Sequence, residues 1–183
     1  MKGNSIWRKL FHFSGIILPL ACLVFGRTFA ISLCAVLLGI CIVLEVVRIK
    51  GYVTLHVAKD LFKEHEKKRP TGSFFFLLSS LVTLLAFGDR YAVPSLFVLS
   101  ISDPLSSYVG YHFGKTPAFG KSLQGLLTFF FSALIILLFF SFPAYAVTIT
   151  AAAAALTELF SSRYFDDNLS IPIVTALCLS LLA

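Results

Sequence analysis

The fold of this chain is decided by the stretch Arg27-Thr-Phe-Ala-Ile-Ser-Leu-Cys-Ala-Val-Leu-Leu-Gly-Ile-Cys-Ile-Val-Leu-Glu-Val-Val-Arg48. No charged residue stands between Arg27 and Glu45, and such a run is long enough for a helix to cross the hydrocarbon core of a bilayer. Charged residues make up 13% of the 183 residues, and hydrophobic residues make up 58%. Soluble domains carry about 25% charged residues, so the composition predicts an integral membrane protein.

Similar apolar blocks recur on both sides of this stretch, which is typical of a polytopic helical membrane protein. The expected spans are 6–26, 28–48, 73–89, 91–112, 123–142, 143–161 and 168–183. The sequence therefore predicts an all-α membrane bundle of about seven transmembrane helices, built as one integral membrane domain over residues 1–183. The first block is followed by no small-residue cleavage site, so we interpret it as a retained helix.

The segment 51–70 is the one long polar connection. Val53, Val57 and Leu61 recur there at helical spacing among charged residues, which predicts an amphipathic helix on the membrane surface that ends at Pro70. A solvated loop remains the alternative.

The distribution of basic residues predicts the orientation. With the N-terminus placed inside, Arg27 and Arg90 alone of the 15 Lys and Arg residues lie outside. This bias indicates a cell (inner) membrane protein with a cytoplasmic N-terminus. Topology and contact with anionic lipid headgroups then account for the net charge of +6, without any role for nucleic acid.

Asp103 is the most informative polar residue, because it lies within an apolar span. It stands ~18 Å along the helix from Tyr91, in the cytoplasmic half of the membrane. A carboxylate there needs a lysine partner or a divalent cation. A purely structural ion pair with Lys121 or Arg48 stays open.

A loop rich in glycine and lysine follows this span. It contains Gly114-Lys115 and Gly120-Lys121-Ser122, residue types that cradle phosphate through backbone N–H groups and positive charge. A Walker A motif is excluded, because five residues separate Gly114 from Gly120 and no strand is expected before the loop. An ordinary basic loop is the alternative.

Further polar residues gather at the same predicted depth. Asp166, Asp167 and Asn168 stand at a helix start, where they suit both N-capping and Mg²⁺ ligation. The remaining polar site candidates are Arg8, Lys9, His12, Glu45, Arg48, Arg69, Thr71 and Glu158. Placing ionisable residues within membrane spans costs free energy, so such residues are usually kept for function. Their convergence at one depth predicts one functional site on the cytoplasmic side.

The ordered set of short motifs resembles the CTP-dependent lipid-alcohol kinases, which include dolichol kinase, phytol and farnesol kinases and the yeast-type diacylglycerol kinase. The matching residues are Arg8-Lys9-x-x-His12, Glu45-x-x-Arg48, Arg69-Pro70-Thr71-Gly72, Ser102-Asp103, Gly110, Gly114, Phe119-Gly120-Lys121-Ser122, Gly125, Glu158 and Asp166-Asp167-Asn168-Leu169-x-Ile171-Pro172. They cover most of the chain in the family's order.

The resemblance implies Mg²⁺-dependent transfer of the γ-phosphate of CTP to the hydroxyl of a lipid alcohol, with a polyprenol or dolichol-type alcohol expected. The implied roles are catalytic for Asp103, Lys121 and Asp167, metal binding for Asp103, Asp166, Asp167 and Asn168, and nucleotide binding for Gly114, Lys115, Gly120, Lys121, Ser122, Arg8, Lys9, Arg48 and Arg69. Instead of holding the metal, one carboxylate, with Asp103 the first candidate, could orient the lipid hydroxyl as general base. The chain departs from the family at Ser102, Pro104 and Gln124, where the family usually has Gly or Ala, Ala and Glu.

Two alternatives remain at this stage. A CTP:phosphatidate-type cytidylyltransferase would use the same nucleotide but release pyrophosphate. A non-enzymatic transporter or scaffold is a different class, and the near absence of polar residues from the outer half counts against transport. The oligomeric state stays open, with a homodimer as one form.

Overall fold

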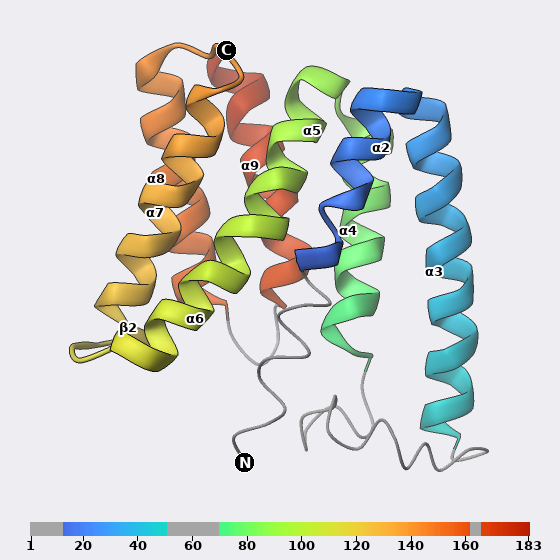
Figure 1. Ribbon diagram of the computed structural model, residues 1–183, viewed down its shortest axis with the longest axis horizontal. Helices are drawn as coiled ribbons and strands as arrows, with labels where there is room; N and C mark the ends of the chain where they lie inside the picture. The colour runs from blue at the N-terminus through green and yellow to red at the C-terminus, as the bar shows by residue number, and fades with distance from the viewer. Residues whose placement is uncertain (1–12, 51–69, 162–165) are drawn as a thin grey trace.

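The computed structural model describes residues 13–50, 70–161 and 166–183, which form a helical bundle (Figure 1). Its elements in chain order are α2 (Ile17–Phe25), α3 (Arg27–Ile49), α4 (Gly72–Ala86), α5 (Asp89–Phe97), the π-helix η3 (Val98–Ser102), α6 (Asp103–Phe113), β1 (Pro117–Ala118), β2 (Lys121–Ser122), α7 (Leu123–Leu138), α8 (Ala144–Phe160) and α9 (Asp167–Leu182). The expected all-helical fold is confirmed, apart from one short hairpin formed by β1 and β2.

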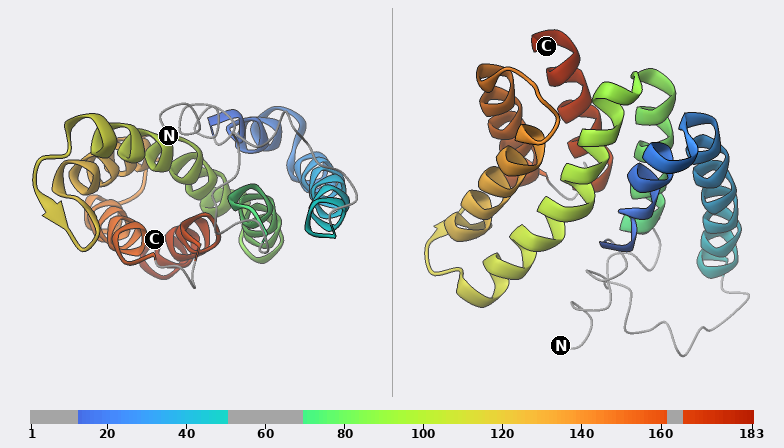
Figure 2. Two further views of the ribbon diagram at one scale, coloured as in Figure 1. Left: turned by 90° about the horizontal axis from the view of Figure 1, so that it is seen from below. Right: turned by 45° about the horizontal axis from the view of Figure 1, so that its top comes forward.

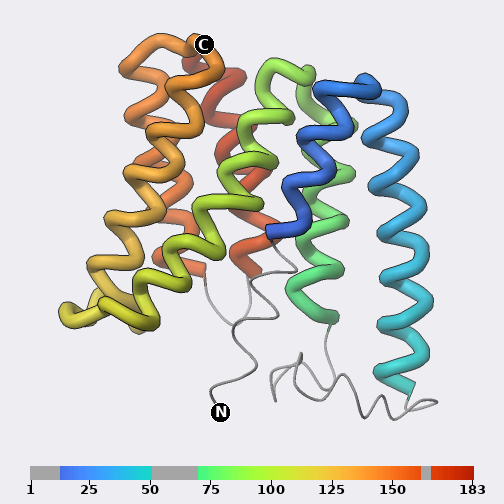
Figure 3. Tube along the Cα trace, in the orientation of Figure 1, coloured from blue at the N-terminus to red at the C-terminus, as the bar shows by residue number. Residues whose placement is uncertain are grey.

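The elements follow the order that the apolar blocks predict. The path α5–η3–α6 is one slanting helical rod in the tube view (Figure 3). Counted this way, the described residues form seven helical rods, one for each expected span. The amphipathic helix expected at 51–70 and the site candidates Arg8, Lys9, His12 and Arg69 lie outside the described residues.

Among the described residues, α3 is the one helix both long and apolar enough to cross a membrane on length and composition alone. The helices α4, α7, α8 and α9 are apolar but shorter. Large apolar side chains of α3 face outward, among them Val36, Ile40, Val43 and Leu44. Exposing such an apolar face to water costs free energy, whereas contact with lipid tails avoids that cost. The polytopic arrangement itself remains a prediction.

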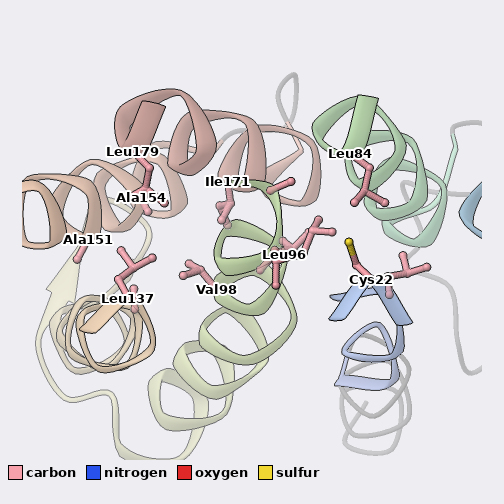
Figure 4. Packing of buried hydrophobic residues seen from close by; sticks show 14 of the residues in the cluster. Cys22, Leu84, Leu96, Val98, Leu137, Ala151, Ala154, Ile171 and Leu179 are labelled. Carbon is pink, nitrogen blue, oxygen red and sulfur yellow. The ribbon is translucent and has the colours of Figure 1, made fainter. Parts of the chain in front are cut away.

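The rod α5–η3 forms the centre of the core. Leu96 and Val98 are fully buried and lie near Ile171 of α9, with Leu84 of α4 and Cys22 of α2 to one side (Figure 4). A second group joins α7, α8 and α9 through Leu137, Ala151, Ala154 and Leu179. The alanines on α8 allow close helix packing, as small residues do between membrane helices.

Proline chemistry explains why the central rod departs from the α-helix. Pro104 has no N–H, so it cannot donate to the carbonyl of Ser100 as an α-helix requires. The turn widens there into η3, at Val98–Ser102, and α6 begins directly afterwards at Asp103. Single π turns of this kind are frequent at functional sites. The rod thus changes geometry at the carboxylate that the sequence singles out.

Several helix ends meet at one end of the bundle, which is the lower end in Figure 1. The helices α4, α7 and α9 begin there, and α6 and α8 end there. The view from below shows an elongated bundle, with α3 at one end and the β1–β2 hairpin at the other (Figure 2). Because the termini of five helices come together, side chains distant in sequence can share one site.

Candidate active site

A pocket of about 560 Å³ lies at this end of the bundle. It is lined from α4, α6, the hairpin, α7, α8 and the start of α9 by Gly72, Asp103, Pro104, Ser106, Ser107, Gly110, Gly114, Lys115, Thr116, Pro117, Gly120, Lys121, Ser122, Gly125, Leu126, Glu158, Asp166, Asp167 and Asn168. The pocket therefore gathers most of the site candidates that the sequence offers.

Three carboxylates from three helices converge in this pocket. Asp103 begins α6, Glu158 lies near the end of α8 and Asp167 begins α9. One oxygen from each lies within 4.8 Å of the others. Glu158 and Asp103 are 4% and 9% exposed, so both charges are largely withdrawn from water. Burying like charges so close together is unfavourable without cations between them.

The ammonium group of Lys121 supplies positive charge at this cluster. Its Nζ lies 2.6 Å from Glu158 Oε1 and 3.5 Å from Asp167 Oδ2. It also donates to the Glu158 carbonyl at 2.5 Å and to Ser161 Oγ at 3.2 Å. The structure thus pairs Lys121 with Glu158 and Asp167, whereas Arg48 pairs with Glu45.

The three polar residues at the start of α9 have different roles. Asp166 caps the helix, because its Oδ1 accepts from Asn168 N at 3.0 Å and from Asn168 Nδ2 at 2.6 Å. Asp167 points to the carboxylate cluster. Asn168 Oδ1 is buried and has no hydrogen-bond partner among the described residues. An unsatisfied buried oxygen beside carboxylates is a suitable cation ligand.

The glycines of the loop serve two structural purposes. A Cβ on Gly114 would lie 2.2 Å from the Gly110 carbonyl oxygen, within the end of α6, and 2.7 Å from Ser122 Cβ. The second contact shows that this glycine permits the end of α6 to approach the start of α7. Gly120 has φ +84° and shares the two-residue hairpin turn with Phe119, at φ +47°. Such turns need positive φ at both positions.

Gln124 closes the loop over the pocket, a role that the sequence did not reveal. Its Oε1 accepts from the backbone N–H groups of Lys115 and Thr116 at 3.1 and 3.2 Å. A glutamate at this position could accept the same two bonds.

Replacing Gln124 with Leu is expected to speed hydrogen exchange at the backbone N–H groups of Lys115 and Thr116 about tenfold, because both donors lose their acceptor. Gln124→Glu, which keeps an acceptor, should stay within about threefold of wild type. Hydrogen exchange in detergent on both variants checks the result, and equal exchange rates for Leu and Glu would contradict the loop-closing role.

A second polar cluster lies beside the pocket. Glu45 of α3 is 8% exposed, and its Oε1 accepts from Thr71 N at 3.0 Å and from Thr71 Oγ1 at 2.5 Å. Arg48 donates from Nε to Glu45 Oε2 at 3.1 Å. Thr71 precedes Gly72, which lines the pocket. The cluster therefore ties α3 to Thr71, the residue directly before α4, and none of its three members lines the pocket itself.

Thr71→Val is expected to destabilise the protein by about 1–3 kcal/mol, because the buried Glu45 carboxylate loses a hydroxyl donor. Thr71→Ser keeps the hydroxyl and should melt within about 1–2 °C of wild type. Thermal unfolding in detergent measures both, and an unchanged midpoint for Thr71→Val would show that this bond contributes nothing.

The site residues expected from the sequence fall into three groups. Those that the pocket brings together are Asp103, Gly114, Lys115, Gly120, Lys121, Ser122, Glu158, Asp166, Asp167 and Asn168. Glu45, Arg48 and Thr71 form the neighbouring cluster, and Arg8, Lys9, His12 and Arg69 lie outside the described residues. Glu158, expected only as a further polar candidate, joins Asp103 and Asp167 where Asp166 was expected. Its place within an apolar span was the available signal.

Comparison with known proteins finds relatives that match between 69% and 94% of this chain. No family model and no solved structure matches. The chain is 33% identical to Uncharacterized protein RP860 of Rickettsia prowazekii and 28% identical to Uncharacterized protein MJ1137 of Methanocaldococcus jannaschii, each over 94% of this chain and 91% of the relative. It is 30% identical to CTP-dependent diacylglycerol kinase 1 of Schizosaccharomyces pombe, over 69% of this chain and 66% of that protein. The chain therefore belongs to one family with the Rickettsia protein and is a distant relative of a CTP-dependent diacylglycerol kinase.

Proposed function

We propose that this protein is a membrane lipid kinase that transfers the γ-phosphate of CTP to the hydroxyl of a lipid alcohol, of which a polyprenol or dolichol-type alcohol is the expected class. The observation that carries the proposal is the convergence of Asp103, Glu158 and Asp167 around Lys121 in one pocket. Phosphoryl transfer needs this combination of cation ligands and positive charge. The relation to a CTP-dependent diacylglycerol kinase supports the donor and the class of acceptor.

The carboxylate cluster offers the oxygen ligands that Mg²⁺ prefers. At about 2.1 Å in octahedral geometry, neighbouring ligands of the ion stand about 3.0 Å apart and opposite ligands about 4.2 Å apart. The three oxygens, which lie within 4.8 Å of one another, would therefore draw together by up to about 1.8 Å around a bound ion. Asn168 Oδ1 offers a further oxygen. A bound Mg²⁺ would neutralise charge on the phosphate oxygens as it develops.

The other charged residues of the pocket have separate proposed roles. Lys115 and Lys121 place positive charge on the loop side, where they orient the polyphosphate. Asp103, which begins α6 directly after the π turn, is the proposed acceptor of the proton from the lipid hydroxyl. Because the carboxylates lie on three different helices, the rigid bundle sets the distance between donor and acceptor.

Apolar surfaces beside the pocket support a lipid acceptor. Leu126 lines the pocket, and the outward face of α7 continues upward through Leu127, Phe131, Ile135 and Leu138. On α6, the exposed Tyr108, Tyr111 and Phe113 stand near the same end. Aromatic side chains of this kind favour the membrane interface. We place the pocket at the cytoplasmic headgroup layer, with the lipid tail held among the helices.

Product analysis tests the proposal. Purified protein in detergent with Mg²⁺ receives CTP or ATP and a panel of polyprenols, phytol and diacylglycerol, and mass spectrometry identifies the lipid product. A lipid monophosphate with CDP is the expected result. A CDP-lipid formed only from phosphatidate would instead indicate the cytidylyltransferase, and no product from any acceptor with folded protein would overturn the enzymatic assignment.

A matched pair of variants distinguishes the product of this protein from the product of contaminating kinases. Asp103→Asn removes a pocket carboxylate, whereas Asp89→Asn removes an exposed carboxylate that pairs with Arg27, away from the pocket lining. Product that disappears in the first variant and persists in the second comes from this pocket.

A further inference from the structure

Pro172 lies inside α9 and removes one hydrogen bond from the first turns of that helix. In a regular α-helix the N–H of this position would donate to the carbonyl of Asn168, four residues earlier, but proline has no N–H. Asn168 is 5% exposed, so water has little access to replace the missing donor. Because a buried carbonyl without a donor costs free energy, this carbonyl needs a donor from elsewhere in the protein.

The donor comes from a different helix. Ser79 of α4 donates from Oγ to the carbonyl oxygen of Asn168 at 2.6 Å. The same hydroxyl lies 3.0 Å from the Phe76 carbonyl of its own helix, which already accepts from Ser80 Oγ at 2.7 Å. A hydroxyl carries one proton, so the shorter distance assigns the proton of Ser79 to Asn168.

The helical rods adapt to internal prolines in two different ways. At Pro104 the helix widens into η3 directly before α6. At Pro172, by contrast, α9 continues as an α-helix on both sides of the proline. A donor from outside the helix allows α9 to keep its geometry there, because the freed carbonyl still has a partner.

The carbonyl that Ser79 holds belongs to a residue that lines the pocket. Asn168 donates to Asp166 Oδ1 from its backbone N–H at 3.0 Å and from Nδ2 at 2.6 Å. Its Oδ1 is buried and has no hydrogen-bond partner among the described residues. Ser79 is fully buried and is not among the residues that line the pocket. Ser79 therefore acts on the backbone of a pocket residue from outside the pocket.

We infer that Ser79 is a positioning residue of the candidate active site. Its hydroxyl replaces the hydrogen bond that Pro172 removes, and it thereby fixes Asn168 and the neighbouring Asp167 relative to α4. The inference rests on the proposed function in one respect, that misplacing these two residues lowers the rate of lipid phosphate formation.

Hydrogen exchange in detergent, without substrates, tests the local effect. Ser79→Ala is expected to speed exchange about tenfold at the N–H groups of Leu169 and Ser170, which donate to the Asp166 carbonyl at 3.1 and 3.3 Å in the first turn of α9. Ser80→Ala is the matched control, because this buried hydroxyl bonds within its own helix. Its exchange at these positions should stay within about twofold of wild type. Equal exchange in the two variants would overturn the inference.

A double-mutant cycle with Pro172→Ala separates this hydrogen bond from a general packing role. Alanine restores the N–H, so α9 regains its own donor to the Asn168 carbonyl. In the Pro172→Ala background, Ser79→Ala should therefore change the exchange rates by less than about twofold. A tenfold effect in both backgrounds would contradict the inference. If Ser79→Ala alone does not fold, recovery of folding in the double variant supports the inference, and a double variant that stays unfolded overturns it.

Initial rates connect the hydrogen bond to catalysis. Ser79→Ala should lower kcat for lipid phosphate formation about tenfold, whereas Ser80→Ala keeps the wild-type rate. Adding Pro172→Ala to Ser79→Ala should restore kcat to within about threefold of wild type. An unchanged kcat in a folded Ser79→Ala protein would overturn the positioning role.

The exchange and rate measurements distinguish this inference from the proposed function. The predicted exchange cycle without lipid phosphate from any acceptor would sustain the hydrogen bond between α4 and α9 and defeat the kinase assignment. Lipid phosphate formation together with exchange that Ser79→Ala leaves unchanged would do the reverse.

Discussion

Asp103→Asn is expected to lower the rate of lipid phosphate formation by about 10³-fold or more. The substitution keeps the size and shape of a side chain that is 9% exposed in the pocket wall, but it removes the negative charge and the proton acceptor. Loss of a general base alone costs about 10²–10⁴-fold, and loss of a cation ligand adds to that cost. Initial rates at saturating CTP and lipid measure the effect.

Two comparisons make this result specific to the site. The melting temperature of Asp103→Asn should stay within a few degrees of wild type, because the amide keeps the size and shape of the buried carboxyl group. The remote Asp89→Asn should keep full activity. Turnover within threefold of wild type in a folded Asp103→Asn protein would remove Asp103 from the mechanism.

Gly114→Ala is expected to reduce the free energy of unfolding by about 3 kcal/mol, at the upper end of overpacking effects. The new methyl group would stand 2.2 Å from the Gly110 carbonyl oxygen of α6 and 2.7 Å from Cβ of Ser122, the residue directly before α7, so backbone has to move rather than a flexible side chain. The start of α7 and the loop with Lys115 would shift with it, and activity should fall as well. Thermal unfolding and initial rates measure the two effects.

Gly39→Ala is the matched control for this overpacking. Gly39 lies inside α3, and a Cβ added there meets no atom within 4 Å. Alanine is the better helix former by about 1 kcal/mol, so this variant should be as stable as wild type or more stable. A Gly114→Ala protein as stable as Gly39→Ala would show that α6 and α7 do not depend on this close approach.

Apolar patterning predicted the helical rods well. The span expected at 28–48 is the helix Arg27–Ile49, and the span expected at 168–183 is Asp167–Leu182. Charged or capping residues stand at these ends. Their preference for helix termini depends on neighbouring residues alone, so it can be recognised from the sequence. The same information cannot show membrane insertion, because the shorter helices are apolar without being long enough on this measure alone.

The hairpin and the π turn had weaker signals. The hairpin turn places Phe119 at positive φ, a conformation usually taken by Gly, Asn or Asp, so the sequence lacked the usual turn residues. The π turn depends on bonding five residues apart, which apolar periodicity does not report. Pro104, directly after Asp103, was its only local sign.

The candidate site was predicted in its residues but not in its contacts. Asp103, Lys121 and Asp167 were expected together, because polar residues within spans at one depth converge. The partner of Lys121 was not foreseen, since Glu158 stands 37 residues further along the chain and only the packing of α7 on α8 brings the two together. The role of Gln124 likewise depends on the turn of the loop.

The position of a labelled phosphorus atom tests the central claim most directly. Purified protein is given an acceptor lipid and CTP labelled at either the α or the γ phosphorus, and the extracted lipid is counted. We predict that label from the γ position enters the lipid and label from the α position does not. Entry of the α label would contradict γ-phosphate transfer and show that a cytidylyl group moves instead.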